Sequence, residues 1–318
     1  MNKILFIYNP LAGKGRIKKM LSDIIELFNR NMYEVVVYST LCKKDAKRIV
    51  EDCIKSQNYD YIVCSGGDGT LNEVVNGVMT SDRKPQIGYI PSGTTNDIAY
   101  SLNIPKNMLK ATQLIVDKRS TSYDIGSFNE DYFVYSAAFG LFTDTTYQTP
   151  QYIKNMIGRL AYIMEGIKSL SAWKSYHVEI SYEDKVISDK FIFGMITNSK
   201  SVGGFKGIAG KDIVLNDGQF ECLFIRMPHN LIEIQNIIND LGKGNLNSDR
   251  IISFQIKQIN IKSEEAVPWT LDGEYGGSLH HVDIKNCKQA ISIVSLLGGR
   301  SKKREGTPDQ AAKSVFRN

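Results

Sequence analysis

Short apolar runs alternate with helical patterns in the N-terminal third of the chain. Strand-like runs are expected at residues 3–9, 34–40, 61–65 and 86–90. Between them, apolar residues recur at helical spacing, and a last helix is expected to start near Asn96. This alternation is typical of a parallel sheet covered by helices. Residues 1–120 are therefore predicted to form an α/β domain.

The pattern changes after residue 120, where strand-like segments dominate. These segments are 132–138, 177–182, 191–197, 219–226, 251–261 and 290–295. One helical stripe interrupts them at residues 152–170, and we interpret it as a helix that contacts the core rather than a membrane. Residues 121–296 are predicted to form a mainly antiparallel β-sandwich. Residues from about 297 to 318 are expected to return to the first domain.

Composition excludes several classes of protein. The 318 residues are 42% hydrophobic and 23% charged, which does not fit a disordered chain, a collagen or a small disulfide scaffold. Five scattered cysteines predict reduced, buried thiols in a cytoplasmic protein, and the four histidines form no zinc pattern. The net charge of +5 is concentrated in residues 300–318, which carry six basic and two acidic residues. We therefore expect no nucleic-acid-binding face, and a solvated tail that is alternatively attracted to anionic lipid headgroups.

Three loops rich in Gly, Ser, Thr and Asn follow predicted strands and precede helices. They span residues 9–15, 66–70 and 92–97. Ligands of open α/β sheets bind at the carboxyl ends of the strands, and the N–H groups at a helix start attract phosphate. Glycines let the backbone approach phosphate oxygens. Because Asp68 would repel a bare pyrophosphate, the pattern favours a nucleotide bound with Mg²⁺ over NAD.

Two of these loops carry motifs that resemble the diacylglycerol kinase catalytic-domain family. The motifs are GGDGTLNE at residues 66–73 and PSGTTNDIA at residues 91–99. The resemblance extends through NP and GKG within residues 9–15 and through LDGE at residues 271–274, so it covers the chain to about residue 297. The first motif has relatives in NAD kinases and phosphofructokinases. The combination favours a lipid substrate.

The resemblance implies an NAD kinase/diacylglycerol kinase-like fold that binds ATP in the cleft between its two domains. It implies transfer of the γ-phosphoryl group to the hydroxyl of diacylglycerol, which gives phosphatidic acid. Asp68 and Asp97 match positions that help to hold the catalytic Mg²⁺ through water. The expected nucleotide-binding positions are Asn9, Pro10, Gly13, Thr40, Gly66, Gly67, Asp68, Gly69, Thr70, Asn72, Thr94, Asn96 and Asp97.

The resemblance also implies a general base in the segment from Asp272 to Glu274. A lipid alcohol must lose its proton as it attacks phosphorus, and a carboxylate within hydrogen-bond reach can accept it. We expect Glu274 to be this base, with Asp272 as the competing candidate; the simplest alternative is a plain Asp-Gly turn. A second, structural Mg²⁺ is implied at Val214, Asp217 and Gln219, although an apolar residue is more usual than Gln219.

Other substrates and roles stay open from the sequence. The acceptor could be a sphingoid base, ceramide, a polyprenol or, less favourably, NAD, and a non-catalytic regulator would also fit the fold. Trp269 is interpreted as a core residue and His280 with His281 as a surface pair. We expect a cytoplasmic protein in transient peripheral contact with the inner membrane face, where its lipid substrate resides. The oligomeric state is open, with a homodimer among the alternatives.

Overall fold

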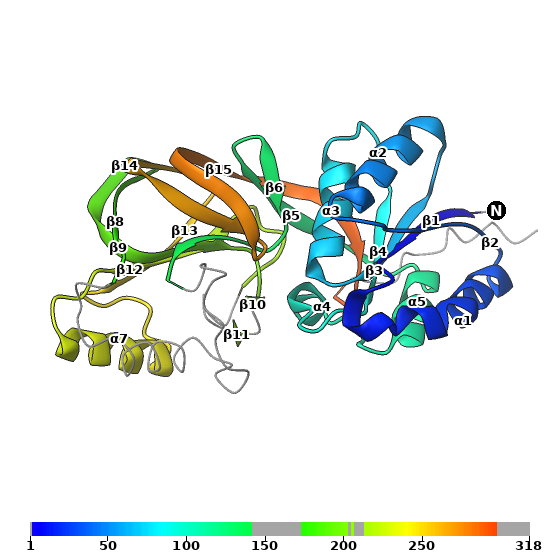
Figure 1. The fold of residues 1–318 in the computed structure, drawn as a ribbon, viewed down its shortest axis with the longest axis horizontal. Helices are drawn as coiled ribbons and strands as arrows, with labels where there is room; N and C mark the ends of the chain where they lie inside the picture. Colours follow the sequence, from blue (N-terminus) through cyan, green and yellow to red (C-terminus); the bar gives the residue numbers. More distant parts are fainter. Residues whose placement is uncertain (1, 142–172, 203–204, 207–212, 298–318) are drawn as a thin grey trace, which may run out of the picture.

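The computed structural model describes residues 2–141, 173–202, 205–206 and 213–297. The chain forms two lobes that lie side by side along the longest axis of the molecule (Figure 1). The predicted helix at residues 152–170 and the basic tail lie outside the described residues. Within the described ranges, no helix has the length and apolar character needed to cross a membrane.

The N-terminal lobe is built on a parallel sheet. Its strands are β1 (Asn2–Tyr8), β2 (Tyr33–Ser39), β3 (Tyr61–Gly66) and β4 (Gln86–Pro91), hydrogen-bonded in the order β2-β1-β3-β4. The helices are α1 (Ile17–Arg30), α2 (Asp45–Ser56), α3 (Asp68–Met79), α4 (Asp97–Ser101) and α5 (Met108–Val116), with a 3₁₀ turn, η1, at Ala12–Gly15. The predicted mixed α/β class is confirmed.

The periodicity of the chain explains these layers. The central strands β3 and β4 are buried along almost their whole length, as expected when helices cover both faces of a parallel sheet. Helix α1 packs with α5 and α2 packs with α3, and the two pairs lie on opposite sides of the sheet (Figure 1). The loops at the carboxyl ends of the strands therefore stay uncovered, where they can bind a ligand.

The second lobe is antiparallel. Its main strands are β5 (Ser120–Phe128), β6 (Asp131–Phe133), β7 (Ser136–Gly140), β8 (Tyr176–Tyr182), β9 (Lys185–Thr197), β12 (Phe220–Arg226), β13 (Ile251–Ile256), β14 (Gln258–Leu271) and β15 (Glu274–Val294). The long strands β9 and β14 each pair with β8 through their first half and with β7 through their second half. The lobe thus closes around an aromatic core that includes Trp269, which is 1% exposed, so its predicted core position is confirmed.

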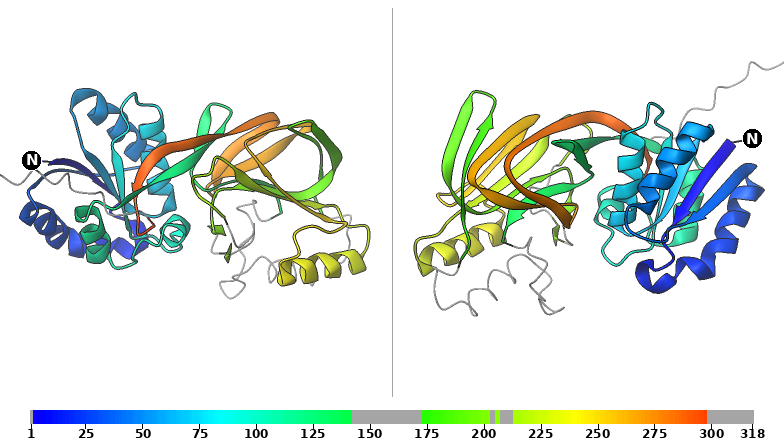
Figure 2. Two further views of the ribbon diagram at one scale, coloured as in Figure 1. Left: turned by 180° about the vertical axis from the view of Figure 1, so that it is seen from behind. Right: turned by 45° about the horizontal axis from the view of Figure 1, so that its top comes forward.

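Strand β15 joins the two lobes. It pairs with β14 through its first half and with β5 through its second half, and Ile293 near its end lies parallel to Ile87 of β4. Figure 2 shows this strand curving out of the β-rich lobe and into the N-terminal lobe. Two smaller elements complete the second lobe: a short hairpin of β10 (Ser201–Val202) with β11 (Phe205–Lys206), and helix α7 (Leu231–Lys243).

Some local predictions for the second lobe are wrong. The strand predicted at residues 132–138 is two strands, because the backbone N–H groups of Val134, Tyr135 and Ser136 turn to the Asp272 carboxylate. The strand predicted at 251–261 is also split, between β13 and β14, and helix α7 was not predicted.

The predicted exposure is confirmed for the two histidines but only in part for the cysteines. His280 and His281 are both exposed, as predicted. All five cysteines are free, but Cys42 is exposed and Cys287 is half-buried, so the prediction of buried thiols is wrong for these two.

Candidate active site

A cleft of about 720 Å³ opens where the loops of the N-terminal lobe meet the turn between β14 and β15. It contains residues that lie far apart in the sequence. Ten of the predicted site residues line it, namely Asn9, Gly13, Thr40, Gly67, Gly69, Thr70, Asn72, Thr94, Asp272 and Glu274. Five others do not line it, namely Pro10, Gly66, Asp68, Asn96 and Asp97.

Two glycines allow the phosphate loops to touch. Gly13 has a φ of +55°, and a Cβ there would lie 1.8 Å from the carbonyl oxygen of Ser92. A Cβ on Gly93 would lie 2.5 Å from the Cα of Gly67. Glycine is the residue that tolerates both the left-handed backbone and this contact. The three loops can therefore form one continuous wall, with their backbone groups close to the cleft.

Asp68 links two of these loops from behind the wall. Its carboxylate accepts hydrogen bonds from the backbone N–H groups of Asp97 (3.1 Å) and Ile98 (3.4 Å), at the start of α4. Burial raises the pKa of Asp68 to about 6, and the negative charge of Asp97 adds to the rise that these hydrogen bonds oppose. The carboxylate of Asp68 thus holds the start of α4 and lies within the electrostatic influence of Asp97.

Asn96 supports the third loop rather than facing the cleft. It adopts a left-handed backbone with φ of 56°, and its side chain accepts a hydrogen bond from the Tyr89 hydroxyl (3.1 Å) and donates one to the carbonyl of Gly93 (2.8 Å). The amide therefore holds Gly93 in place. This local role explains its position outside the cleft wall.

Glu73 holds the loop that follows β2. Its carboxylate accepts hydrogen bonds from the backbone N–H groups of Lys44 (2.8 Å) and Ala46 (3.1 Å), at the start of α2. Thr40, just before this loop, donates its N–H to the carbonyl of Tyr8 (2.9 Å). Glu73 belongs to the GGDGTLNE motif, but its partners lie 27 and 29 residues away, so the sequence did not show this role.

Asp272 is enclosed by donors. It is only 6% exposed, and its carboxylate accepts hydrogen bonds of 2.6–2.9 Å from three successive backbone N–H groups and from Nδ2 of Asn72. Burial raises the pKa of Asp272, and the four hydrogen bonds oppose that rise. Asp272 and Gly273 both have positive φ, so they also form the two-residue hairpin turn between β14 and β15. The carboxylate is thus engaged in holding the turn.

Glu274 stands in a different environment, two residues further on. Its side chain is 63% exposed at the cleft, and Oε2 lies 2.7 Å from Nζ of Lys43 in the loop after β2. This ion pair bridges the two lobes. Of the two carboxylates in the motif, Glu274 is the one that a molecule entering the cleft could reach.

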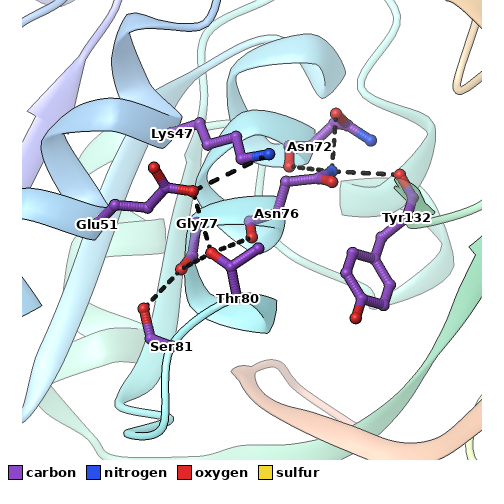
Figure 3. A network of polar contacts seen from close by, with 8 residues as sticks. All are labelled: Lys47, Glu51, Asn72, Asn76, Gly77, Thr80, Ser81 and Tyr132. Carbon is purple, nitrogen blue, oxygen red and sulfur yellow. Dashed lines mark hydrogen bonds and ion pairs between the residues drawn. The ribbon is translucent and has the colours of Figure 1, made fainter. Parts of the chain in front are cut away.

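Asn76 fixes the orientation of the Asn72 side-chain amide, which faces Asp272. The side-chain Nδ2 of Asn76 donates to the Oδ1 of Asn72 (3.2 Å) and to the carbonyls of Asn72 and Tyr132 (Figure 3). The Nδ2 of Asn72 is thereby directed to Asp272, at 2.6 Å. Asn76 was not predicted, although an asparagine inside a helix, four residues after Asn72, was a usable signal.

The segment predicted to hold a structural cation forms a tight turn. Oδ1 of Asp217 accepts a hydrogen bond from the N–H of Gln219 (2.9 Å), whereas Val214 is half exposed. The N–H of Gly218 donates to Asp124 (2.6 Å), a fully buried carboxylate that belongs to none of the predicted motifs.

The atoms in this region that could coordinate a cation are oxygen atoms, which suit a hard cation. Asp124 also accepts hydrogen bonds from the N–H of Gln289 and from Nδ2 of Asn286. Two amide oxygens, Oδ1 of Asn198 and Oδ1 of Asn286, are buried without a hydrogen-bond partner. In the part of the chain that the structure describes, no three or more His, Cys, Asp or Glu side chains cluster as a metal site. A cation here would therefore need carbonyl groups and water beside the carboxylate of Asp217.

Comparison with known proteins places the chain in a class of enzymes. The diacylglycerol kinase catalytic domain matches residues 3–128, and the YegS C-terminal NAD kinase beta sandwich-like domain matches residues 143–294. A diacylglycerol kinase of Bacillus subtilis (strain 168) is 36% identical over 281 residues, which cover 88% of this chain and 92% of the relative. One of Staphylococcus haemolyticus (strain JCSC1435) is 34% identical over 290 residues, covering 91% and 87%.

A solved structure shares the fold. The crystal structure of a diacylglycerol kinase from Bacillus anthracis str. Sterne has a TM-score of 0.71 at 23% identity and covers 92% of this chain and 97% of that one. The family matches show that the protein is an ATP-dependent phosphotransferase that acts on an alcohol group. The chain belongs to the diacylglycerol kinase family.

Proposed function

We propose that this protein phosphorylates the hydroxyl of diacylglycerol with ATP and yields phosphatidic acid. The observation that carries the proposal is the contrast at the β14–β15 turn. Glu274 is accessible at the cleft, whereas the carboxylate of Asp272 is enclosed by four donors. The names of the relatives supply the substrate class.

The phosphates of ATP would lie against the wall formed by the three glycine loops. Gly67, Gly69 and Thr70 line the cleft at the start of α3, where the helix dipole and the N–H groups favour negative charge. Gly13 and Thr94 line it from the neighbouring loops. This arrangement supports binding of a polyphosphate with its γ-phosphoryl group directed to the β14–β15 turn.

Asp68 and Asp97 are the proposed holders of a catalytic Mg²⁺, through water. When bound, Mg²⁺ would neutralise charge on the phosphate oxygens. Burial, with a smaller contribution from the charge of Asp97, raises the pKa of Asp68, so a neighbouring cation would favour the ionised carboxylate. We propose Val214, Asp217 and Gln219 for a second, structural Mg²⁺, held by one carboxylate and two carbonyl groups.

Glu274 is the proposed general base. As the hydroxyl oxygen of the lipid attacks the γ-phosphorus, Glu274 accepts the hydroxyl proton. A new P–O bond forms, the bond from the γ-phosphorus to the β–γ bridging oxygen breaks, and ADP leaves with that electron pair. Asp272 acts through Glu274, because it holds the turn that carries the base.

The reaction would take place from the cytoplasm, at the inner membrane face. Diacylglycerol resides in the bilayer, so the protein would contact the membrane peripherally while lipid enters the cleft. Another lipid alcohol, such as a sphingoid base, ceramide or a polyprenol, would use the same chemistry. Size-exclusion chromatography with light scattering would decide between a monomer and the homodimer that the sequence leaves open.

The test is a substrate panel with Mg²⁺-ATP in mixed micelles. The micelles would hold diacylglycerol, monoacylglycerol, ceramide, sphingosine and a polyprenol, with NAD tested in parallel. Mass spectrometry would identify each phosphorylated product. We expect phosphatidic acid as the main product. Phosphate found only on another lipid, or on NAD, would refute the proposed substrate, and ATP binding without any transfer would favour a non-catalytic role.

A further inference from the structure

A pair of buried serine contacts joins the two lobes beside the nucleotide loops. Oγ of Ser201, at the start of β10, donates to Oδ1 of Asp97 at 2.6 Å. Oγ of Ser199 lies 2.8 Å from Oγ of Ser101 at the end of α4. All four residues are at most 3% exposed. The second lobe is thus fastened to the short helix α4 by two hydroxyl contacts of similar length and burial.

The two contacts differ in what they hold. Ser101 and Ser199 are neutral groups, and neither touches a residue of the proposed cation site. Ser201 instead contacts a carboxylate whose own backbone N–H donates to Asp68. An O–H donor that meets an ionised oxygen within 2.5–2.7 Å forms a charge-assisted hydrogen bond, about twice as strong as a neutral one.

The donor to Asp97 therefore comes from the other lobe, 104 residues away in sequence. A serine donor fixes the side-chain rotamer of a buried aspartate without adding charge. This bond links the position of the second lobe to the orientation of the Asp97 carboxylate.

We propose that Ser201 is a positioning residue for Asp97: it supplies the hydroxyl that orients the cation-holding carboxylate when the second lobe is in place. The inference rests on the proposed function, in which Asp97 helps to hold Mg²⁺ with ATP. It adds that the lipid-binding lobe completes the nucleotide site. The segment that contains β10 thus connects the two halves of the reaction.

The structure offers a matched control. Ser201→Ala removes the hydroxyl that faces Asp97, and Ser101→Ala removes a hydroxyl that joins the same two segments without touching Asp97. Ser101 Oγ also accepts a hydrogen bond from the N–H of Lys200 (3.2 Å), so Ser101→Ala loses two interlobe contacts and should be destabilised at least as much as Ser201→Ala. A role limited to joining the lobes predicts that Ser101→Ala weakens nucleotide binding at least as much, whereas positioning of Asp97 predicts an effect of Ser201→Ala alone.

The experiment measures binding of a fluorescent ATP analogue to the full chain as Mg²⁺ is titrated, and again in EDTA. We expect Ser201→Ala to raise the Mg²⁺ concentration for half-maximal binding by about tenfold, as loss of a hydrogen bond to a charged group implies. Binding of the analogue to Ser201→Ala in EDTA should not change. For Ser101→Ala, binding should stay within about twofold of wild type both in the Mg²⁺ titration and in EDTA. Equal shifts in the two variants, or no shift in Ser201→Ala, would overturn the inference.

Two further arms keep the test decisive. If Ser201→Ala does not fold, Ser201→Cys keeps a side chain of similar shape with a weak donor, and it should raise the Mg²⁺ requirement in the same direction. A wild-type Mg²⁺ requirement in that variant would contradict the proposal. Wild-type protein that binds ATP with Mg²⁺ but phosphorylates no lipid would refute the proposed function, while the binding comparison would still decide the role of Ser201.

Discussion

Replacement of Asp272 by asparagine should destabilise the fold. An amide has the shape of the carboxylate, but one of its two oxygens becomes an NH₂ donor. In the structure, one carboxylate oxygen accepts from the N–H groups of Tyr135 and Ser136, and the other accepts from Val134 N–H and Asn72 Nδ2. In either orientation, the NH₂ group of the variant would face two donors.

The magnitude follows from the two donors that this leaves without an acceptor. Leaving a buried polar group unsatisfied costs about 1–3 kcal/mol, so Asp272→Asn should lower the free energy of unfolding by about 2–6 kcal/mol. For chains of this size, about 1 kcal/mol corresponds to about 2–4 °C in Tm, so the expected decrease is on the order of 10 °C. Activity would also fall, because the turn that carries the base is disturbed.

The control is Glu274→Gln, which should leave the stability unchanged and remove the activity. Glu274 and its partner Lys43 are 63% and 83% exposed, and exposed ion pairs contribute only about 0–1 kcal/mol to stability. Loss of a general base, by contrast, lowers turnover about 10²- to 10⁴-fold. Glu274→Gln should therefore keep its Tm and lose transfer.

The assay pairs urea unfolding, followed by circular dichroism, with radiolabelled phosphate transfer on the same preparations. Unfolding of Asp272→Asn at the wild-type urea concentration would contradict a structural role of this carboxylate. Equal destabilisation of Glu274→Gln and Asp272→Asn would contradict it too, since the two carboxylates would then have the same structural role.

Three further predictions concern the loops around the cleft. Because burial raises the pKa of Asp68 to about 6, ionising it opposes folding: without Mg²⁺, the free energy of unfolding should fall as pH rises from about 4 to above 6. Urea titrations across this range should show the fall in wild type, and a matching slope in Asp68→Asn would contradict it. Gly13→Ala places a Cβ 1.8 Å from a carbonyl oxygen and should weaken ATP-analogue binding at least about tenfold and lower Tm, whereas Gly69→Ala, with no atom within 4 Å of its Cβ, should keep the wild-type Tm. Lys43→Met should change Tm by less than about 2 °C in a thermal melt, since its ion pair with Glu274 is exposed; a larger decrease would show that this pair holds the lobes together.

Contiguous motifs were the part of the site that sequence could predict. The glycine loops carry their backbone chemistry locally, so the sequence alone was enough to predict that Gly13, Gly67, Gly69 and Thr70 lie near one another, and all four line the cleft. The α/β class followed from the alternation of buried strands with amphipathic helices. Each of these signals lies within a short stretch of chain.

Contacts between distant segments were not predictable from one sequence. Ser201 meets Asp97 across 104 residues, and Lys43 meets Glu274 across 231 residues. A serine or a lysine in a loop has no local signature for such a partner. The sequence could not decide between Asp272 and Glu274 as the base for the same reason, because the burial of Asp272 depends on contacts with Asn72 in α3 and with residues 134–136.

Helix α7 was missed for a different reason. Its signals are local: Asn230 accepts a hydrogen bond from the N–H of Glu233 at the first turn, and Gly244 ends the helix in a left-handed conformation. Both are ordinary start and stop residues. The surrounding strand-like runs masked them, since a β-rich stretch raised the expectation of further strands.

Transfer of radiolabelled γ-phosphate from ATP to diacylglycerol tests the central claim most directly. Wild type and Glu274→Gln would be compared at equal occupancy by nucleotide, which a binding titration with the ATP analogue sets beforehand. The account predicts labelled phosphatidic acid from wild type and a decrease of about 10²-fold or more for Glu274→Gln, with nucleotide affinity unchanged. Full transfer by the variant, or label that never enters the lipid with wild type, would contradict it.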